Sequence, residues 1–247
     1  MPAHGTSDVS IPLPSGGALR AAMAVPGGEG VAAADGRPGM LVLHEAYGLN
    51  DDMRRIAARF ATNGYVTIVP DLYSEGNTAL CLSRMLLDAA FREARHTMAV
   101  IEAARAWLAD RADVDSGRVG VIGFCMGGGF ALLFAARGTV GVAGVNYGPV
   151  PKRRERLTGV CPVVASYGAL DKQLAPSARR LEEHLTALGV PHDVKMYEGA
   201  GHSFWSYDNV PSWATKLPDM GKAGYVESAA EDAWDRVLSF FAQHLAQ

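Results

Sequence analysis

The sequence predicts one α/β domain with a mainly parallel sheet and helices on both faces, in the doubly wound arrangement. Three observations predict this fold class. Strand-like and helix-like segments alternate along most of the 247 residues. Several strand segments are wholly apolar, as in strands that are covered on both faces. The connections between successive strands hold helices, as parallel pairing requires. We expect the domain to span residues 1–247, with residues 1–7 as a flexible tail.

Apolar or β-branched runs between turn residues predict the strands. The first two are expected to form a hairpin around Ser15-Gly16-Gly17, and Pro26–Gly39 is expected to be a surface loop. Pro70 ends the fourth strand, because proline has no N–H for a ladder. The expected strands are Val9–Leu13, Ala18–Val25, Met40–His44, Tyr65–Val69, Arg118–Ile122, Val140–Val145, Pro162–Tyr167 and His192–Tyr197.

Apolar positions at helical spacing predict the helices. Asp51 and Asp52 favour the start of the first helix, and Gly64 and Gly189 end two of the helices. The expected helices are Asp51–Asn63, Ala79–Asp110 in one or two pieces, Met126–Arg137, Pro176–Leu188 and Glu227–Leu245. Active sites of such sheets lie beyond the carboxyl ends of the strands, so the residues directly after each strand are the candidates.

Composition excludes several classes of protein. The 23 Lys+Arg against 26 Asp+Glu give a net charge of -3, which argues against nucleic-acid binding. No apolar run is long enough to span a membrane, and the first residues do not form a secretory signal, so we expect a cytoplasmic protein. The three cysteines, Cys81, Cys125 and Cys161, form neither a disulfide framework nor a CxxC metal or redox site. We expect no metal and no cofactor.

Cys125 is the candidate nucleophile. It lies in Gly123-Phe124-Cys125-Met126-Gly127, between an expected strand and an expected helix. This is the Gly-x-nucleophile-x-Gly pattern of a nucleophile elbow, in which the glycines leave room where the backbones crowd. The helix N-terminus favours the thiolate, and the Met126 N–H can face a developing oxyanion. The alternatives are a glycine-rich turn with a buried structural cysteine and a phosphate loop, and no Walker or GxGxxG pattern supports the latter.

His202 and Asp171 are the candidate base and its orienting acid. Both follow strands at the expected functional edge, in the order nucleophile, acid, histidine that is typical of the nucleophile-elbow enzymes. His44 also follows a strand, but it precedes Cys125 in the chain. Asp171 could instead cap a helix or stabilise a turn, and Asp71 is a rival acid that lies early in the sequence.

Together these motifs resemble the dienelactone hydrolase (carboxymethylenebutenolidase) family over most of the chain. The resemblance rests on His44-Glu45-Ala46-Tyr47-Gly48-Leu49-Asn50, Pro70-Asp71-Leu72-Tyr73, Gly123-Phe124-Cys125-Met126-Gly127-Gly128 and Gly199-Ala200-Gly201-His202-Ser203-Phe204. It implies an α/β-hydrolase fold and hydrolysis of a small-molecule ester or lactone by Cys125, Asp171 and His202, without a cofactor. The resemblance and the charge together suggest a soluble monomer.

The resemblance also implies further roles near the thiol. Glu45 would help to deprotonate it, and the N–H groups of Ala46 and Met126 would bind the oxyanion. The alternative for Glu45 is an ordinary carboxylate on a surface loop. We expect the aromatic side chains that accompany these motifs to contact substrate, with ordinary packing as their alternative. These are Tyr47, Trp205 and Tyr207.

One departure from the family concerns substrate charge. Members that act on dienelactone carry two arginines that bind the substrate carboxylate, and this chain has Glu75 and Ser206 at the matched positions. Arg84 is a possible substitute. We therefore expect preference for a neutral or bulkier ester or lactone. Two rival functions keep the same scaffold: a non-hydrolytic ligand-binding protein, and a redox sensor that uses the Cys125 thiol.

Overall fold

The computed structural model describes residues 5–27, 36–74, 94–207 and 224–245. The chain divides into two compact units, Met1–Val119 and Gly120–Gln247. Strand β5 (Val114–Phe124) contains the boundary between them.

The first unit contains a hairpin followed by a parallel strand pair. Strands β1 (Ser7–Pro12) and β2 (Ala18–Ala24) are antiparallel, and β2 pairs antiparallel with β4 (Val66–Pro70). Strand β3 (Arg37–Leu43) pairs parallel with β4, which gives the local order β1-β2-β4-β3. The last five residues of β3 and all of β4 are buried, as their apolar sequences require.

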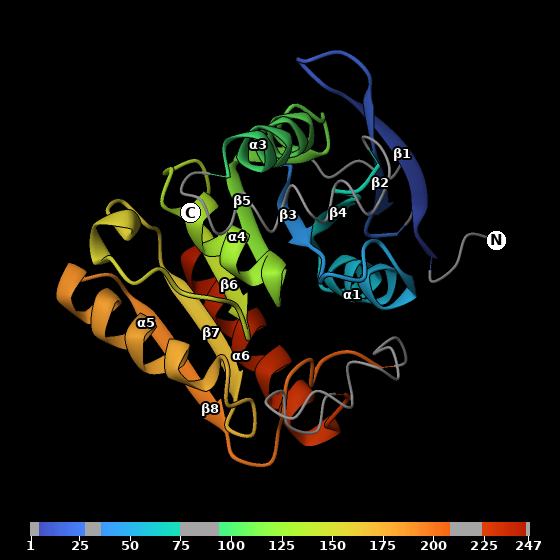
Figure 1. Ribbon diagram of the computed structural model, residues 1–247. Coiled ribbons are helices and arrows are strands. Elements are labelled where there is room, and N and C mark those ends of the chain that lie inside the picture. Colours follow the sequence, from blue (N-terminus) through green and yellow to red (C-terminus); the bar gives the residue numbers. More distant parts are fainter. Residues whose placement is uncertain (1–4, 28–35, 75–93, 208–223, 246–247) are drawn as a thin grey trace. The chain divides into compact units, whose positions relative to one another are not determined.

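Two helices pack on this part of the sheet. Helix α1 (Asp51–Thr62) contacts β2, β3 and β4, and α3 (Arg95–Ala109) contacts β1, β3 and β4. Figure 1 shows α1 and α3 on opposite sides of β3 and β4. The side chain of Asn50 caps α1 by accepting a hydrogen bond from the Met53 N–H, over 3.0 Å.

The second unit is wholly parallel. Its strands follow in the order β5-β6-β7-β8, with β6 at Val142–Asn146, β7 at Val163–Gly168 and β8 at His192–Tyr197. Helix α4 (Met126–Ala135) packs on β6, α5 (Ala175–Leu188) on β7 and β8, and α6 (Glu227–His244) on β6 and β7. In Figure 1, α5 and α6 lie on opposite faces of β7. A short 3-10 helix, Arg154–Leu157, follows β6.

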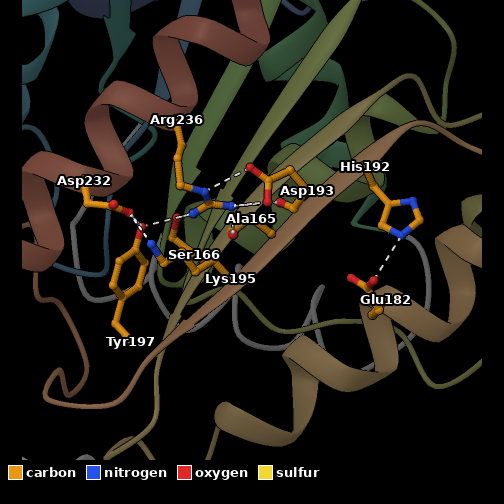
Figure 2. Close-up of polar contacts among 9 residues, drawn as sticks. All are labelled: Ala165, Ser166, Glu182, His192, Asp193, Lys195, Tyr197, Asp232 and Arg236. Atoms are coloured by element: carbon orange, nitrogen blue, oxygen red, sulfur yellow. Dashed lines mark hydrogen bonds and ion pairs between the residues drawn. The ribbon is translucent and has the colours of Figure 1, made fainter.

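Arg236 of α6 joins that helix to β7 and β8 (Figure 2). Its guanidinium forms an ion pair of 2.6 Å with Asp193 and donates hydrogen bonds to the Ser166 Oγ and the Tyr197 hydroxyl, over 3.2 and 3.0 Å. The Tyr197 hydroxyl donates over 2.6 Å to Asp232, which also pairs with Lys195. We call these six side chains the Arg236 network.

The alternation of strands and helices confirms the predicted fold class, and most differences lie at element ends. Strand β5 begins at Val114, four residues before the predicted Arg118, because its first half is partly exposed and forms no apolar run. Arg37–Gly39 belong to β3, although they were expected to lie in the Pro26–Gly39 loop.

The N-terminal tail differs from expectation, and the long helix is confirmed where the structure describes it. Thr6 is buried and Ser7 begins β1, so the expected tail over residues 1–7 is wrong at its carboxyl end. Of the long helix expected at Ala79–Asp110, the structure describes residues 94–110 and forms α3 there. Residues 79–93, which include Cys81 and Arg84, lie outside the described residues. The expected single domain stays a prediction.

Candidate active site

Cys125 lies at a strained turn between β5 and α4. Its φ of 54° and ψ of -122° are unusual for a residue with a side chain, and its N–H donates to the Asn146 carbonyl over 3.0 Å. A Cβ on Gly123 would lie 2.0 Å from the Gly127 carbonyl oxygen, so only glycine fits there. The predicted need for glycine at position 123 is confirmed.

The side chains of Cys125, His202 and Asp171 form one continuous hydrogen-bonded chain within the second unit. The Cys125 Sγ lies 3.1 Å from Nε2 of His202, and Nδ1 of His202 lies 2.7 Å from Oδ2 of Asp171. His202 and Asp171 are 3% and 1% exposed, so solvent scarcely weakens this contact. The structure therefore brings together the three residues that sequence reasoning selected.

Asp171 is held by both of its carboxylate oxygens. Oδ1 accepts hydrogen bonds from the N–H groups of Gln173 and Leu174, both over 3.1 Å, while Oδ2 faces His202. The alternative role considered for this residue, a turn aspartate, is thus also present. The turn fixes the rotamer of the carboxylate, and the fixed carboxylate then orients the imidazole ring.

The loops that carry Asp171 and His202 are tied together by backbone contacts. The N–H of Leu170 donates to the Ala200 carbonyl over 3.0 Å, and the N–H of Ala169 donates to the Tyr197 carbonyl over 2.9 Å. A Cβ on Gly168 would lie 2.4 Å from the Gly201 carbonyl oxygen. This close approach explains why β7 ends in glycine.

The contacts of His202 determine its protonation. Burial lowers the pKa of His202, but the hydrogen bonds to Asp171 and Cys125 outweigh it and raise the pKa to about 10. The raised pKa favours the protonated ring, in which Nδ1 donates to Asp171 and Nε2 can donate to the sulfur. A sulfur beside a ring that can hold a proton is the pairing that covalent acyl transfer uses.

Aromatic packing around His202 was only partly anticipated. Trp205 is buried against Phe124 and Trp234, with ring centroids 5.3 and 5.6 Å apart, so the packing alternative describes it at least in part. Tyr207 is 53% exposed and stacks on Tyr225 at 4.2 Å. Neither observation tests a role in binding substrate.

Tyr147 was missed in the sequence. It directly follows β6, has a φ of 39° and packs its ring 5.1 Å from that of His202. Its position after a strand, in Asn146-Tyr147-Gly148, was the available signal.

The segment Glu45–Tyr47 belongs to the first unit and follows β3. Glu45 is 2% exposed, so it is not the surface carboxylate that was its alternative. The Glu45 carbonyl accepts from Nδ1 of His44 over 2.6 Å and from the Gly48 N–H over 3.1 Å. Tyr73 donates from its hydroxyl to the Ala46 carbonyl over 3.0 Å. The segment is therefore ordered by hydrogen bonds to its backbone.

Cys161, a metal site and a membrane-spanning helix are the other features considered. Burial raises the pKa of the Cys161 thiol to about 12, so this cysteine is a poor thiolate at neutral pH. Within the described ranges, no three His, Cys, Asp or Glu side chains gather as a metal site would need. None of the described helices combines the length and apolar character that crossing a bilayer requires.

Known proteins match both the sequence and the fold. The profile of the dienelactone hydrolase family matches residues 28–245. A carboxymethylenebutenolidase of Rhodococcus opacus is 27% identical over 217 residues, which cover 83% of this chain and 81% of the relative.

Two solved structures extend the likeness in fold. A dienelactone hydrolase-like promiscuous phosphotriesterase from metagenomic libraries has a TM-score of 0.81 at 22% identity, covering 97% of this chain and 99% of that one. An esterase of Pyrobaculum calidifontis has a TM-score of 0.67 at 17% identity, covering 99% and 87%. The chain belongs to the dienelactone hydrolase family, and it is a hydrolase that acts on esters or lactones.

Proposed function

We propose that this enzyme cleaves a lactone or carboxylic ester through Cys125, His202 and Asp171, with a thioester acyl-enzyme as intermediate. One observation carries the proposal: Sγ of Cys125 lies 3.1 Å from Nε2 of His202, whose Nδ1 lies 2.7 Å from Asp171. A nucleophile, a proton carrier and an orienting carboxylate in this sequence are the parts that covalent acyl transfer needs.

The reaction would begin with the thiolate. The Cys125 sulfur attacks the carbonyl carbon, and negative charge develops on the carbonyl oxygen. The Met126 N–H supports this step, because it opens α4 and lies among the first N–H groups, which a helix leaves without partners of its own. From the resemblance we assign the second donor to the N–H of Ala46. The Nε2 proton of His202 then passes to the leaving oxygen, which leaves a thioester on Cys125.

Water would complete the cycle. Neutral His202 accepts a proton from water at Nε2, and the resulting hydroxide attacks the thioester carbonyl. Collapse releases the carboxylic acid and restores the sulfur and the imidazolium. Asp171 keeps its charge throughout and holds the ring in position through the 2.7 Å contact at Nδ1. No step in this proposal uses a metal or a cofactor.

Glu45 has an assisting role in the proposal. By resemblance, its carboxylate helps to form the thiolate when substrate arrives. Its burial just beyond the carboxyl end of β3 supports this role, because an ordinary loop carboxylate would be solvated.

The proposed substrate is a neutral or bulkier ester or lactone. Ser206 is buried at one of the two positions where the family carries a carboxylate-binding arginine. The other, Glu75, lies outside the described residues, as does Arg84. Trp205, Tyr207 and Tyr47 are the proposed contacts of an aromatic substrate. We further propose that the enzyme is a cytoplasmic monomer.

Kinetics on a set of charged and uncharged esters and lactones tests this proposal. We expect an uncharged aryl ester to have a higher kcat/KM than dienelactone, because no guanidinium at position 206 binds the acid. Cys125→Ala should abolish turnover of every substrate, while Cys125→Ser retains a small part. Preference for the anionic lactone would contradict the proposed specificity, and turnover by Cys125→Ala would contradict the mechanism.

A further inference from the structure

Tyr197 occupies a position that connects both polar loops of the proposed site. It is the last residue of β8, five residues before His202. Its carbonyl accepts hydrogen bonds from the N–H of Ala169 over 2.9 Å and from that of Ala200 over 3.2 Å. Ala169 lies in the loop that carries Asp171, and Ala200 lies in the loop that carries His202. The orientation of the Tyr197 carbonyl therefore affects the positions of both loops.

The ring of Tyr197 reaches the same place through packing. Its centroid lies 5.2 Å from that of Phe204, and the Phe204 ring lies 5.5 Å from that of Tyr147. Tyr147 in turn packs 5.1 Å from the His202 ring. A displacement of Tyr197 would thus act on the imidazole along two routes, one through the backbone and one through aromatic rings.

Strand β8 lies at the end of the strand order in this unit, so β7 is the neighbour that holds it within the sheet. The Arg236 network supplies a second hold, from α6 (Figure 2). Besides Asp193, Tyr197 and Ser166, the guanidinium donates to the carbonyls of Ala165 and Asp193, over 3.4 and 3.2 Å. One side chain therefore fixes β8 against β7 at both the amino and carboxyl ends of β8.

The Tyr197 hydroxyl has one defined orientation in this network. The hydroxyl donates its one hydrogen bond to Asp232, over 2.6 Å, and its oxygen accepts a hydrogen bond from Arg236, over 3.0 Å. Burial and the contact with Asp232 raise the pKa of Tyr197 to about 12, so the hydroxyl keeps this proton at neutral pH. Both partners come from α6, and they fix the end of β8 relative to that helix.

We propose that Arg236 and Tyr197 are positioning residues that hold the Asp171 and His202 loops at the distance needed for the Nδ1 to carboxylate hydrogen bond. This inference rests on the proposed function of His202. It assigns a role in the reaction to a network that touches neither Cys125 nor His202 directly.

Three variants test the proposal. Tyr197→Phe removes the hydroxyl and keeps the ring, and Arg236→Lys keeps the charge and loses the planar fork. The matched control is His192→Gln, on the same strand but at its amino end, where His192 pairs with Glu182 of α5 over 3.4 Å (Figure 2). For each protein we would measure kcat and KM on an uncharged aryl ester, the thermal midpoint, and the NMR titration of His202.

We expect Tyr197→Phe and Arg236→Lys to lower kcat by about threefold and tenfold, with KM little changed, because a misplaced proton carrier weakens a transition-state contact. The His202 titration should move to lower pH in both, since a weaker contact with Asp171 favours the proton less. His192→Gln should leave kcat and the titration as in the wild type.

A lower thermal midpoint with unchanged kcat and unchanged His202 titration would overturn the proposal and leave the network a purely structural role. An equal effect in His192→Gln would overturn it as well. The proposed function is tested separately, because full turnover by Cys125→Ala would contradict it. In that case the NMR titration of His202 in Tyr197→Phe and Arg236→Lys would still decide whether the network positions the ring. Should Arg236→Lys not fold, Tyr197→Phe supplies the decisive comparison.

Discussion

His202 in the second unit and His44 in the first are both buried after a strand, yet their protonation differs. Contacts with Asp171 and Cys125 raise the pKa of His202 to about 10 in spite of burial. Burial lowers the pKa of His44, and the raising effects of the Glu45 carbonyl and Asp71 are smaller. The shifts therefore favour the imidazolium form of His202 and the neutral imidazole form of His44.

The partners of the two rings explain the difference. His202 has a carboxylate at one nitrogen and sulfur at the other, so the charged ring is stabilised on both sides. His44 donates from Nδ1 to the Glu45 carbonyl and accepts at Nε2 from the Leu72 N–H, over 3.1 Å. A protonated Nε2 would face another N–H. Neutral backbone partners thus favour the neutral form of a buried histidine, and charged partners favour the protonated form that the proposed reaction uses.

His202→Asn tests the proposed proton carrier, and we expect it to lower kcat more than any other variant below. His202→Asn should reduce kcat on an uncharged aryl ester by about 10⁵-fold, because the thiolate loses its counterion and the leaving group its acid. Steady-state kinetics measures this loss. His244→Asn, on the last helix, is the control and should keep wild-type kcat. A loss below tenfold in His202→Asn would show that the reaction does not use this ring.

Asp171→Asn tests the partner that makes His202 differ from His44. Among the contacts that raise the pKa of His202, the hydrogen bond to Asp171 is the largest. We expect kcat to fall by about 10³-fold. In the proposed mechanism the imidazolium is the acid that protonates the leaving oxygen, so activity should fall as the pH rises through about 10 in the wild type. In the variant the pKa is lower, and the fall should begin at lower pH. An unshifted profile of kcat/KM would contradict this role.

His44→Gln tests the neutral histidine through stability. We expect a loss of about 2 kcal/mol in the free energy of unfolding at pH 7, because the Glu45 carbonyl loses a buried donor. Below the ordinary pKa of 6.5 the unfolded wild type binds a proton that native His44 does not, so the wild type loses stability as the pH falls. The difference between the two proteins should therefore shrink in acid. Urea unfolding at several pH values measures it, and a difference that grows in acid would contradict the neutral assignment.

The smallest effect is expected at Arg20. Its guanidinium pairs with Asp71 over 2.8 Å near His44, but its side chain is 75% exposed. Arg20→Ala should change the free energy of unfolding by less than about 0.5 kcal/mol, because exposed ion pairs contribute little. Urea unfolding at pH 7 measures this, and a loss above 2 kcal/mol would show that charge outside the ring matters more than its backbone partners.

The sequence predicted the parts of the molecule that depend on local pattern. Apolar runs located the strands, and Gly123 and Gly127 around Cys125 located the strained turn. Chain order then selected Asp171 and His202. The missed features depend on contacts that form only in the folded chain: the Tyr147 ring packs beside that of His202, and Nε2 of His44 accepts from the Leu72 N–H. No periodicity encodes which carbonyl or N–H a side chain will meet after folding.

Intact-mass analysis of the wild type, quenched in acid during turnover of an uncharged aryl ester, tests whether Cys125 forms the acyl-enzyme. We predict a mass increase equal to the acyl group, located on the peptide that contains Cys125 and absent from Cys125→Ala. Turnover without any acylated Cys125 peptide, or acylation at another residue, would contradict it.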